Sequence, residues 1–172
     1  MARCVELSRL GAAQGEYPFG SLVARGAEII AEGVNHSLRE ADESRHAEII
    51  AISRARKALG KTQLRECTLY TTVEPCPMCS FVIRAAGIRR VVFALHSPVM
   101  GGVSRWDILQ NRTPSRRLRF LMGTPPEIVA GVHADEAQKV WADWRPLVSR
   151  AITALGFFVA RKISDDPTPN RS

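Results

Sequence analysis

Strand-like segments alternate with helix-like segments along most of this chain, and this alternation constrains the fold more than any other feature. Short apolar and β-branched runs predict strands at 21–24, 29–34, 68–73, 91–95 and 127–130. Helical periods predict helices at 2–15, 46–59, 77–86 and 133–155, the last with a kink at Pro146. Such alternation places helices on both faces of a sheet, so we expect an α/β fold.

The first two strands are separated only by a short turn, which predicts a hairpin and therefore a mixed sheet. The segments 35–45 and 96–102 are expected to be loops, and 105–122 to contain one or two short helical turns. The 172 residues show no internal repeat and suit one domain, which we place at 1–160. The polar end of the chain, 161–172, is expected to be a disordered tail.

The chain is basic, with 24 Lys and Arg against 17 Asp and Glu, a net charge of +7. A basic chain suits a polyanionic partner such as nucleic acid, although a bias toward arginine in the composition is an equal alternative. Part of the excess is local, because the segment 105–119 holds five arginines and a single acid. The arginines are Arg105, Arg112, Arg116, Arg117 and Arg119. They can face phosphates, a partner subunit or water, and we favour the last two.

Nothing in the sequence indicates export or a membrane. The first residues lack the apolar core of a signal peptide, and no apolar run approaches the roughly 18 residues of a membrane span. A cytoplasmic, reducing environment is therefore expected for the four cysteines. In that setting a Cys-x-x-Cys pair indicates metal or redox chemistry more often than a disulfide.

His46 and the pair Cys76 and Cys79 form the most informative set in the sequence. One imidazole and two thiolates suit Zn²⁺, and they leave a fourth tetrahedral position for water or hydroxide, as in a catalytic site. Cys4 and Cys67 are less suitable as a fourth ligand, because one lies on the first helix and the other nine residues before the pair. Both predicted ligand groups begin a helix, where the partial positive charge favours thiolate.

Glu48 follows His46 by two residues, and at the first turn of a helix both side chains can reach one site. A bound zinc ion generates a nucleophile from water at neutral pH. Glu48 can take the proton of that water, give it to a ring nitrogen and later protonate the leaving amine. The set therefore indicates hydrolytic deamination. A zinc-stabilised scaffold without activity is an alternative, but it gives Glu48 no role.

The pattern His46-Ala47-Glu48 followed by Pro75-Cys76-Pro77-Met78-Cys79 resembles the cytidine deaminase-like superfamily of zinc deaminases. The resemblance covers roughly residues 5–155. It is nearest the branch of guanine deaminases, cytosine deaminases and tRNA wobble-adenosine deaminases. It implies a three-layer α/β/α sandwich around a mixed five-stranded sheet, and a homodimer. It also implies the zinc ligands given above, Glu48 as general acid and base, and substrate contacts from Asn35 and the backbone N–H of Ala47 or Glu48.

The substrate class rests on weaker signals. Pro18-Phe19-Gly20 is more similar to guanine deaminases, and Phe19 can stack on a free base or belong to the core. Asp107 falls about where guanine deaminases place a carboxylate that binds the base, and the alternative is a solvated acid without a role. Trp106 can cap the pocket by stacking, or it can anchor its loop in the core. We therefore expect a small nucleobase or nucleoside as substrate, most simply free guanine or cytosine. A tRNA wobble-adenosine deaminase is the alternative, supported by the basic segment.

Overall fold

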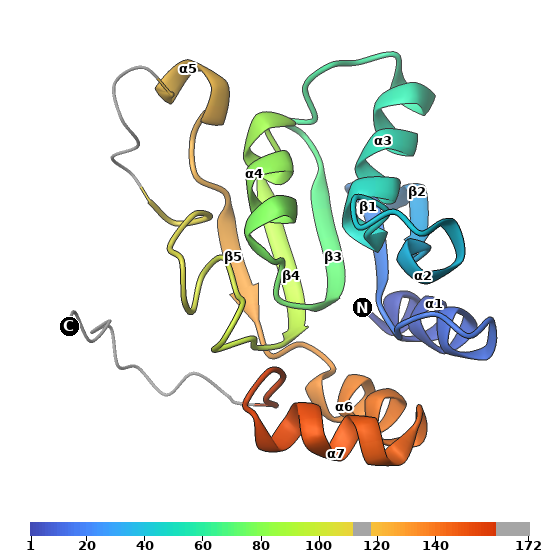
Figure 1. Cartoon of the computed structure of the whole chain (residues 1–172). Helices are drawn as coiled ribbons and strands as arrows, with labels where there is room; N and C mark the ends of the chain where they lie inside the picture. Colours follow the sequence, from blue (N-terminus) through green and yellow to red (C-terminus); the bar gives the residue numbers. More distant parts are fainter. Residues whose placement is uncertain (112–117, 161–172) are drawn as a thin grey trace.

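The computed structural model describes residues 1–111 and 118–160, and the predicted tail lies outside these ranges. Figure 1 shows a central sheet with helices packed around it. The strands are β1 (Gly20–Arg25), β2 (Glu28–Val34), β3 (Thr68–Val73), β4 (Arg90–Leu95) and β5 (Glu127–Ala130). The helices are α1 (Ala2–Ala13), α2 (Ser37–Glu40), α3 (Ala47–Leu59), α4 (Pro77–Ala85), α5 (Arg119–Met122), α6 (Ala134–Asp143) and α7 (Pro146–Ala154).

The five strands form one mixed sheet in the order β2-β1-β3-β4-β5. The hairpin strand β1 pairs antiparallel with both β2 and β3, whereas β3, β4 and β5 pair in parallel. The predicted mixed five-stranded α/β fold is therefore confirmed. Because β2 and β3 are both antiparallel to β1, they run in the same direction and their carboxyl ends meet at one edge of the sheet.

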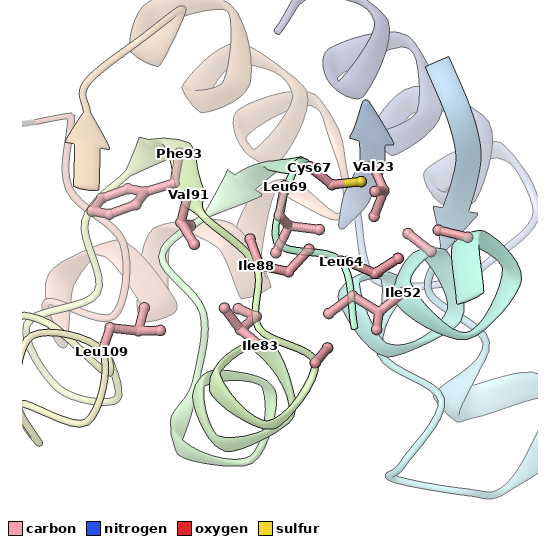
Figure 2. Close-up of a cluster of buried hydrophobic side chains, with 13 residues drawn as sticks. Val23, Ile52, Leu64, Cys67, Leu69, Ile83, Ile88, Val91, Phe93 and Leu109 are labelled. Carbon is pink, nitrogen blue, oxygen red and sulfur yellow. The ribbon is translucent and has the colours of Figure 1, made fainter. Parts of the chain in front are cut away.

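Hydrophobic clusters cover both faces of the sheet. One lies beneath α3 and α4 and contains Val91 and Phe93 of β4, as Figure 2 shows. The neighbouring Ala94 points the other way, into a cluster with Val140 and Trp141 of α6. Side chains alternate between the two faces along a strand, so β4 is buried on both sides. The layers are helix, sheet and helix, with α1 and α6 opposite α3 and α4.

The predicted long helix over 133–155 is wrong, because the structure has two helices there. Helix α6 ends at Asp143, Arg145 adopts a left-handed conformation with φ of 40°, and Pro146 occupies the first turn of α7. Proline is unfavourable inside a helix but favourable at its first position, and it disfavours helical geometry in the residue before it. Pro146 therefore starts a new helix instead of bending one.

Helix α2 is a single helical turn that lies inside the predicted loop 35–45 and was not expected. The short turn expected in 105–122 is present as α5. None of the described helices is both long enough and apolar enough to cross a bilayer.

Helix α3 packs unusually close to β2, and this contact fixes the position of the candidate site. Gly33 of β2 is buried, and a Cβ atom on it would lie 2.2 Å from the carbonyl oxygen of Ala47 and 2.9 Å from the nitrogen of Ala51. Only glycine allows two backbones to approach so closely. The first turn of α3 therefore rests directly on the strand.

Candidate active site

The predicted ligands lie at the starts of two neighbouring helices. His46 is the N-cap residue of α3, and Cys76 is the N-cap residue of α4, with Pro77 at the first helical position. Helix α4 follows β3, and α3 follows β2 after a loop, so both helices begin at the edge where these two strands end (Figure 1). Sequence positions 30 residues apart are brought together in this way.

The three side chains converge to metal-binding geometry. The ligand atoms of His46, Cys76 and Cys79 all lie within 4.8 Å of one another. The Nδ1 atom of His46 is 3.6 Å from the sulfur of Cys76 and 3.4 Å from that of Cys79. One imidazole nitrogen and two sulfurs are a donor set that suits zinc, and no fourth His, Cys, Asp or Glu joins the group among the described residues.

The charges around this set favour a bound cation. The pKa of Cys76 falls to about 4, because its sulfur accepts hydrogen bonds from Cys79 and from the ring of His46, which outweigh the cost of burial. The pKa of Cys79 rises well above its usual range, because it shares a proton with Cys76 and is fully buried. The pKa of His46 is raised, chiefly by its hydrogen bond to Cys76. One thiolate is therefore already favoured, and a zinc ion would displace the remaining proton.

Glu48 lies beside the three predicted zinc ligands and is buried from solvent. Its residue is 5% exposed, and burial raises the pKa of its carboxyl to about 7, with His46 opposing and Cys76 adding to the shift. A carboxyl group that exchanges a proton near neutral pH is suited to general acid and base catalysis. The structure places Glu48 beside the three ligands, and its role as general acid and base stays a prediction.

Phe19 forms an aromatic wall next to the ligand set. Its ring lies 6.3 Å from the ring of His46 at an angle of 23°, so the two are nearly parallel. It also contacts Tyr17 at 6.2 Å, and Trp141 and Phe158 lie edge-on to it at 5.2 and 5.9 Å. Phe19 therefore belongs to an aromatic cluster that borders the ligand set, and its stacking on a free base stays a prediction.

Asn35 and Ala47 are buried close to this edge. Asn35 directly follows β2, is 1% exposed and donates its backbone N–H to the carbonyl of Phe19 over 3.3 Å. Ala47 is the fully buried first residue of α3, between His46 and Glu48. Their positions are compatible with substrate contacts, which stay predictions.

The structure does not bring Asp107 and Trp106 to the ligand set. Trp106 is 55% exposed beneath the guanidinium of Arg105, and Asp107 is exposed with a left-handed φ of 48°. Across the described residues, no hydrogen bond, ion pair or ring contact links either side chain to His46, Cys76, Cys79 or Glu48. Arg112, Arg116 and Arg117 lie outside the described residues, and the side chain of Arg119 is not described.

Glu74 directly precedes the Pro75-Cys76 motif, and no role was expected for it from the sequence. Its buried carboxylate accepts hydrogen bonds from the backbone N–H groups of Ser97, Val103 and Ser104 and from the Ser104 hydroxyl, at 2.6 to 2.8 Å. Burial raises its pKa, but bonds from His96 and these donors outweigh that effect and lower it. Glu74 thus ties the loop after β4 to the strand that leads into Cys76. The sequence feature that could have indicated this role is an acidic residue directly after a predicted buried strand.

A histidine and two cysteines at two adjoining helix starts, with a buried glutamate two residues after the histidine, define the zinc-dependent deaminase class of site. Residues 1–95 match the family model described as the cytidine and deoxycytidylate deaminase zinc-binding region, which covers more than half of the chain. The chain therefore belongs to the cytidine and deoxycytidylate deaminase family.

Relatives within this group differ in substrate. The chain is 35% identical over 138 residues to a tRNA-specific adenosine deaminase of Bacillus subtilis, covering 79% of this chain and 80% of that protein. It is 46% identical over 77 residues to a guanine deaminase of B. subtilis, covering 45% and 49%. A structure from work on tRNA:A34 deaminases superposes with a TM-score of 0.71 at 28% identity, covering 81% of this chain and 99% of that one.

The chain also matches part of a much longer protein. It is 35% identical over 147 residues to a tRNA(Ile)-lysidine synthase of Deinococcus deserti, covering 83% of this chain but only 26% of that protein.

Proposed function

We propose that this chain is a zinc-dependent hydrolytic deaminase of a small nucleobase or nucleoside, with free guanine or cytosine as the first candidates. The observation that carries the proposal is the convergence of His46, Cys76 and Cys79 beside the buried carboxyl of Glu48. Glu48 is not needed to hold a metal, so its burial at this point supports a catalytic centre over a structural zinc site.

The residues divide the reaction between them. His46, Cys76 and Cys79 would hold zinc, which when bound activates water as a nucleophile at neutral pH. Glu48 accepts a proton as the water oxygen bonds to the amine-bearing ring carbon, and gives it to the adjacent ring nitrogen. It then carries the proton of the new hydroxyl group to the amine as the C–N bond breaks and the carbonyl forms. The products are ammonia and a ring carbonyl, so the atoms and charges balance.

The small-substrate proposal is supported by Phe19. A planar heterocycle that enters beside His46 meets an aromatic ring already fixed in place by Trp141 and Phe158. Such a rigid apolar face suits a base. The 46% identity to a guanine deaminase, over 45% of this chain, also supports a free base as substrate.

A tRNA wobble-adenosine deaminase is the second candidate. It is favoured by relatives that match over most of both chains and by the exposed pair of Arg105 and Trp106, where the guanidinium lies 5.5 Å from the ring centre. An exposed aromatic ring next to a cation is a suitable surface for an unstacked base and its phosphate.

A substrate panel separates the two candidates. Ammonia release is measured from zinc-loaded protein with guanine, cytosine, adenine, their nucleosides, and a tRNA that carries adenosine at the wobble position. Turnover of a free base or nucleoside supports the first candidate. Turnover of the tRNA alone, with tRNA binding that weakens steeply as salt is raised, would replace it with the second. Glu48→Gln is the control for contaminating activity.

We further propose that the chain forms a homodimer and works in the cytoplasm. The dimer is supported by Met78 and Phe81, which are 36% and 44% exposed on α4. Burial of such residues on association is typical of homodimer interfaces. The cytoplasmic location is supported by the four cysteines, all of which are free thiols in the structure. Light scattering of the zinc-loaded protein tests the dimer: a monomer mass at micromolar concentration would contradict it.

A further inference from the structure

Glu16 is a buried acid without a counter-ion. It follows the turn at the end of α1 and is 1% exposed, and none of the ion pairs among the described residues includes it. Its carboxylate instead accepts hydrogen bonds from three N–H groups. They are the side-chain amide of Asn35 at 3.1 Å and the backbone N–H groups of Leu38 at 3.2 Å and Arg39 at 2.7 Å.

This arrangement fixes which way the amide of Asn35 faces. Two backbone N–H groups already donate to the Glu16 carboxyl oxygens, so these oxygens act as acceptors, and the Asn35 nitrogen, not its oxygen, must face them. The same nitrogen lies 2.7 Å from the hydroxyl oxygen of Ser37, so both of its hydrogens are used. The amide oxygen Oδ1 is buried and has no partner among the described residues.

An unpaired buried acceptor costs free energy and is seldom retained without a use. Asn35 is bonded through its backbone to Phe19, whose ring in turn faces His46. The chain of contacts from Glu16 through Asn35 and Phe19 therefore ends at the zinc ligands. The Oδ1 atom of Asn35 is therefore an acceptor, without a partner among the described residues, at the edge of the sheet where the zinc ligands lie.

We infer that Glu16 is a positioning residue, which holds Asn35 so that Oδ1 accepts a hydrogen bond from a ring N–H or sugar O–H of the substrate. The inference rests on the proposed function, since it takes the substrate to be a base or nucleoside bound beside the zinc ligands. It adds a requirement on that substrate: it must present a donor to Asn35. Glu16 and Asn35 are 19 positions apart, so no local pattern in the sequence reveals their pairing.

A double-mutant cycle tests the inference. Glu16→Gln, Asn35→Ala and the double variant are compared with the wild type for zinc content, thermal stability and kcat/KM on the most active member of the substrate panel. Glu16→Gln keeps the shape but can turn its amide nitrogen toward Asn35, so we expect full zinc occupancy and a loss of about tenfold or more in kcat/KM. In the Asn35→Ala background, the same change should alter kcat/KM by less than about twofold.

Two further variants keep the test informative. Glu32→Gln replaces a carboxylate that pairs with Arg3 at the surface, and it should leave kcat/KM unchanged. Ser37→Ala removes the other partner of the Asn35 nitrogen while Glu16 is kept, and it should lower kcat/KM by a smaller factor even if Glu16→Gln does not fold.

The outcomes are distinguishable. An equal loss from Glu16→Gln in both backgrounds would show that Glu16 acts only on the fold, and would overturn the inference. An unchanged kcat/KM in Asn35→Ala would remove the substrate contact and the inference together, while leaving the deaminase assignment in place. A panel without any turnover, with zinc fully loaded, would refute the proposed function itself.

Discussion

Replacing Gly33 by alanine should damage both the fold and the active site, because this residue separates β2 from the first turn of α3. The added Cβ would lie 2.2 Å from the oxygen of Ala47 and 2.9 Å from the nitrogen of Ala51. Both are backbone atoms and cannot rotate away, so the helix must shift. Overpacking of this kind costs about 1–3 kcal/mol, and we expect the upper end, about 3 kcal/mol.

For a chain of this size, 1 kcal/mol corresponds to roughly 2–4 °C in Tm, so the expected loss is about 6–12 °C in a thermal melt followed by circular dichroism. The shift also moves His46 and Glu48, which share this turn, and turnover should fall by up to about 10²-fold, as for misplacements near 1 Å. Gly26→Ala is the control. Gly26 also has a special conformation, with φ of 60°, but a Cβ there meets nothing within 4 Å, so only about 1 kcal/mol of backbone strain is expected. A Gly33→Ala protein with wild-type Tm and turnover would refute the close contact.

Three further predictions concern other parts of the structure. His46→Ala should lose zinc and thermal stability together, measured by metal analysis and calorimetry; a variant that keeps one zinc per chain would contradict the ligand assignment. Arg84→Met should lower the free energy of unfolding by at least about 3 kcal/mol in urea, because it removes the four hydrogen bonds that the buried guanidinium donates to the carbonyls of Ile108, Asn111, Met122 and Gly123. An unchanged urea midpoint would refute this. Phe19→Leu should keep zinc and raise KM for a free base by about tenfold, as expected from lost stacking, and an unchanged KM would remove Phe19 from the substrate site.

The sequence was sufficient for the features that depend on local pattern. Strand β3 and helix α3 begin and end within a residue of their predicted bounds, because apolar periodicity and Gly60 specify them locally. His46, Cys76 and Cys79 could be predicted because their residue types are restrictive and both helix starts were visible. The division between α6 and α7 was missed, because Pro146 can either kink a helix or begin one, and the packing around it decides.

Long-range contacts account for the rest. Glu16 pairs with Asn35 across 19 positions, and Glu74 pairs with Ser104 across 30. No periodic pattern connects such residues. The substrate roles expected for Asp107 and Trp106 depended on how a loop folds, and the structure leaves both side chains exposed and without a contact to the zinc ligands.

The most direct test of the account is Glu48→Gln, assayed for zinc content and ammonia release on the same preparation. Glutamine preserves the shape of this buried side chain but cannot accept and return the proton. We predict one zinc per chain, an unchanged melting profile and a loss of turnover of at least about 10²–10⁴-fold. Wild-type turnover in the zinc-loaded variant would contradict it.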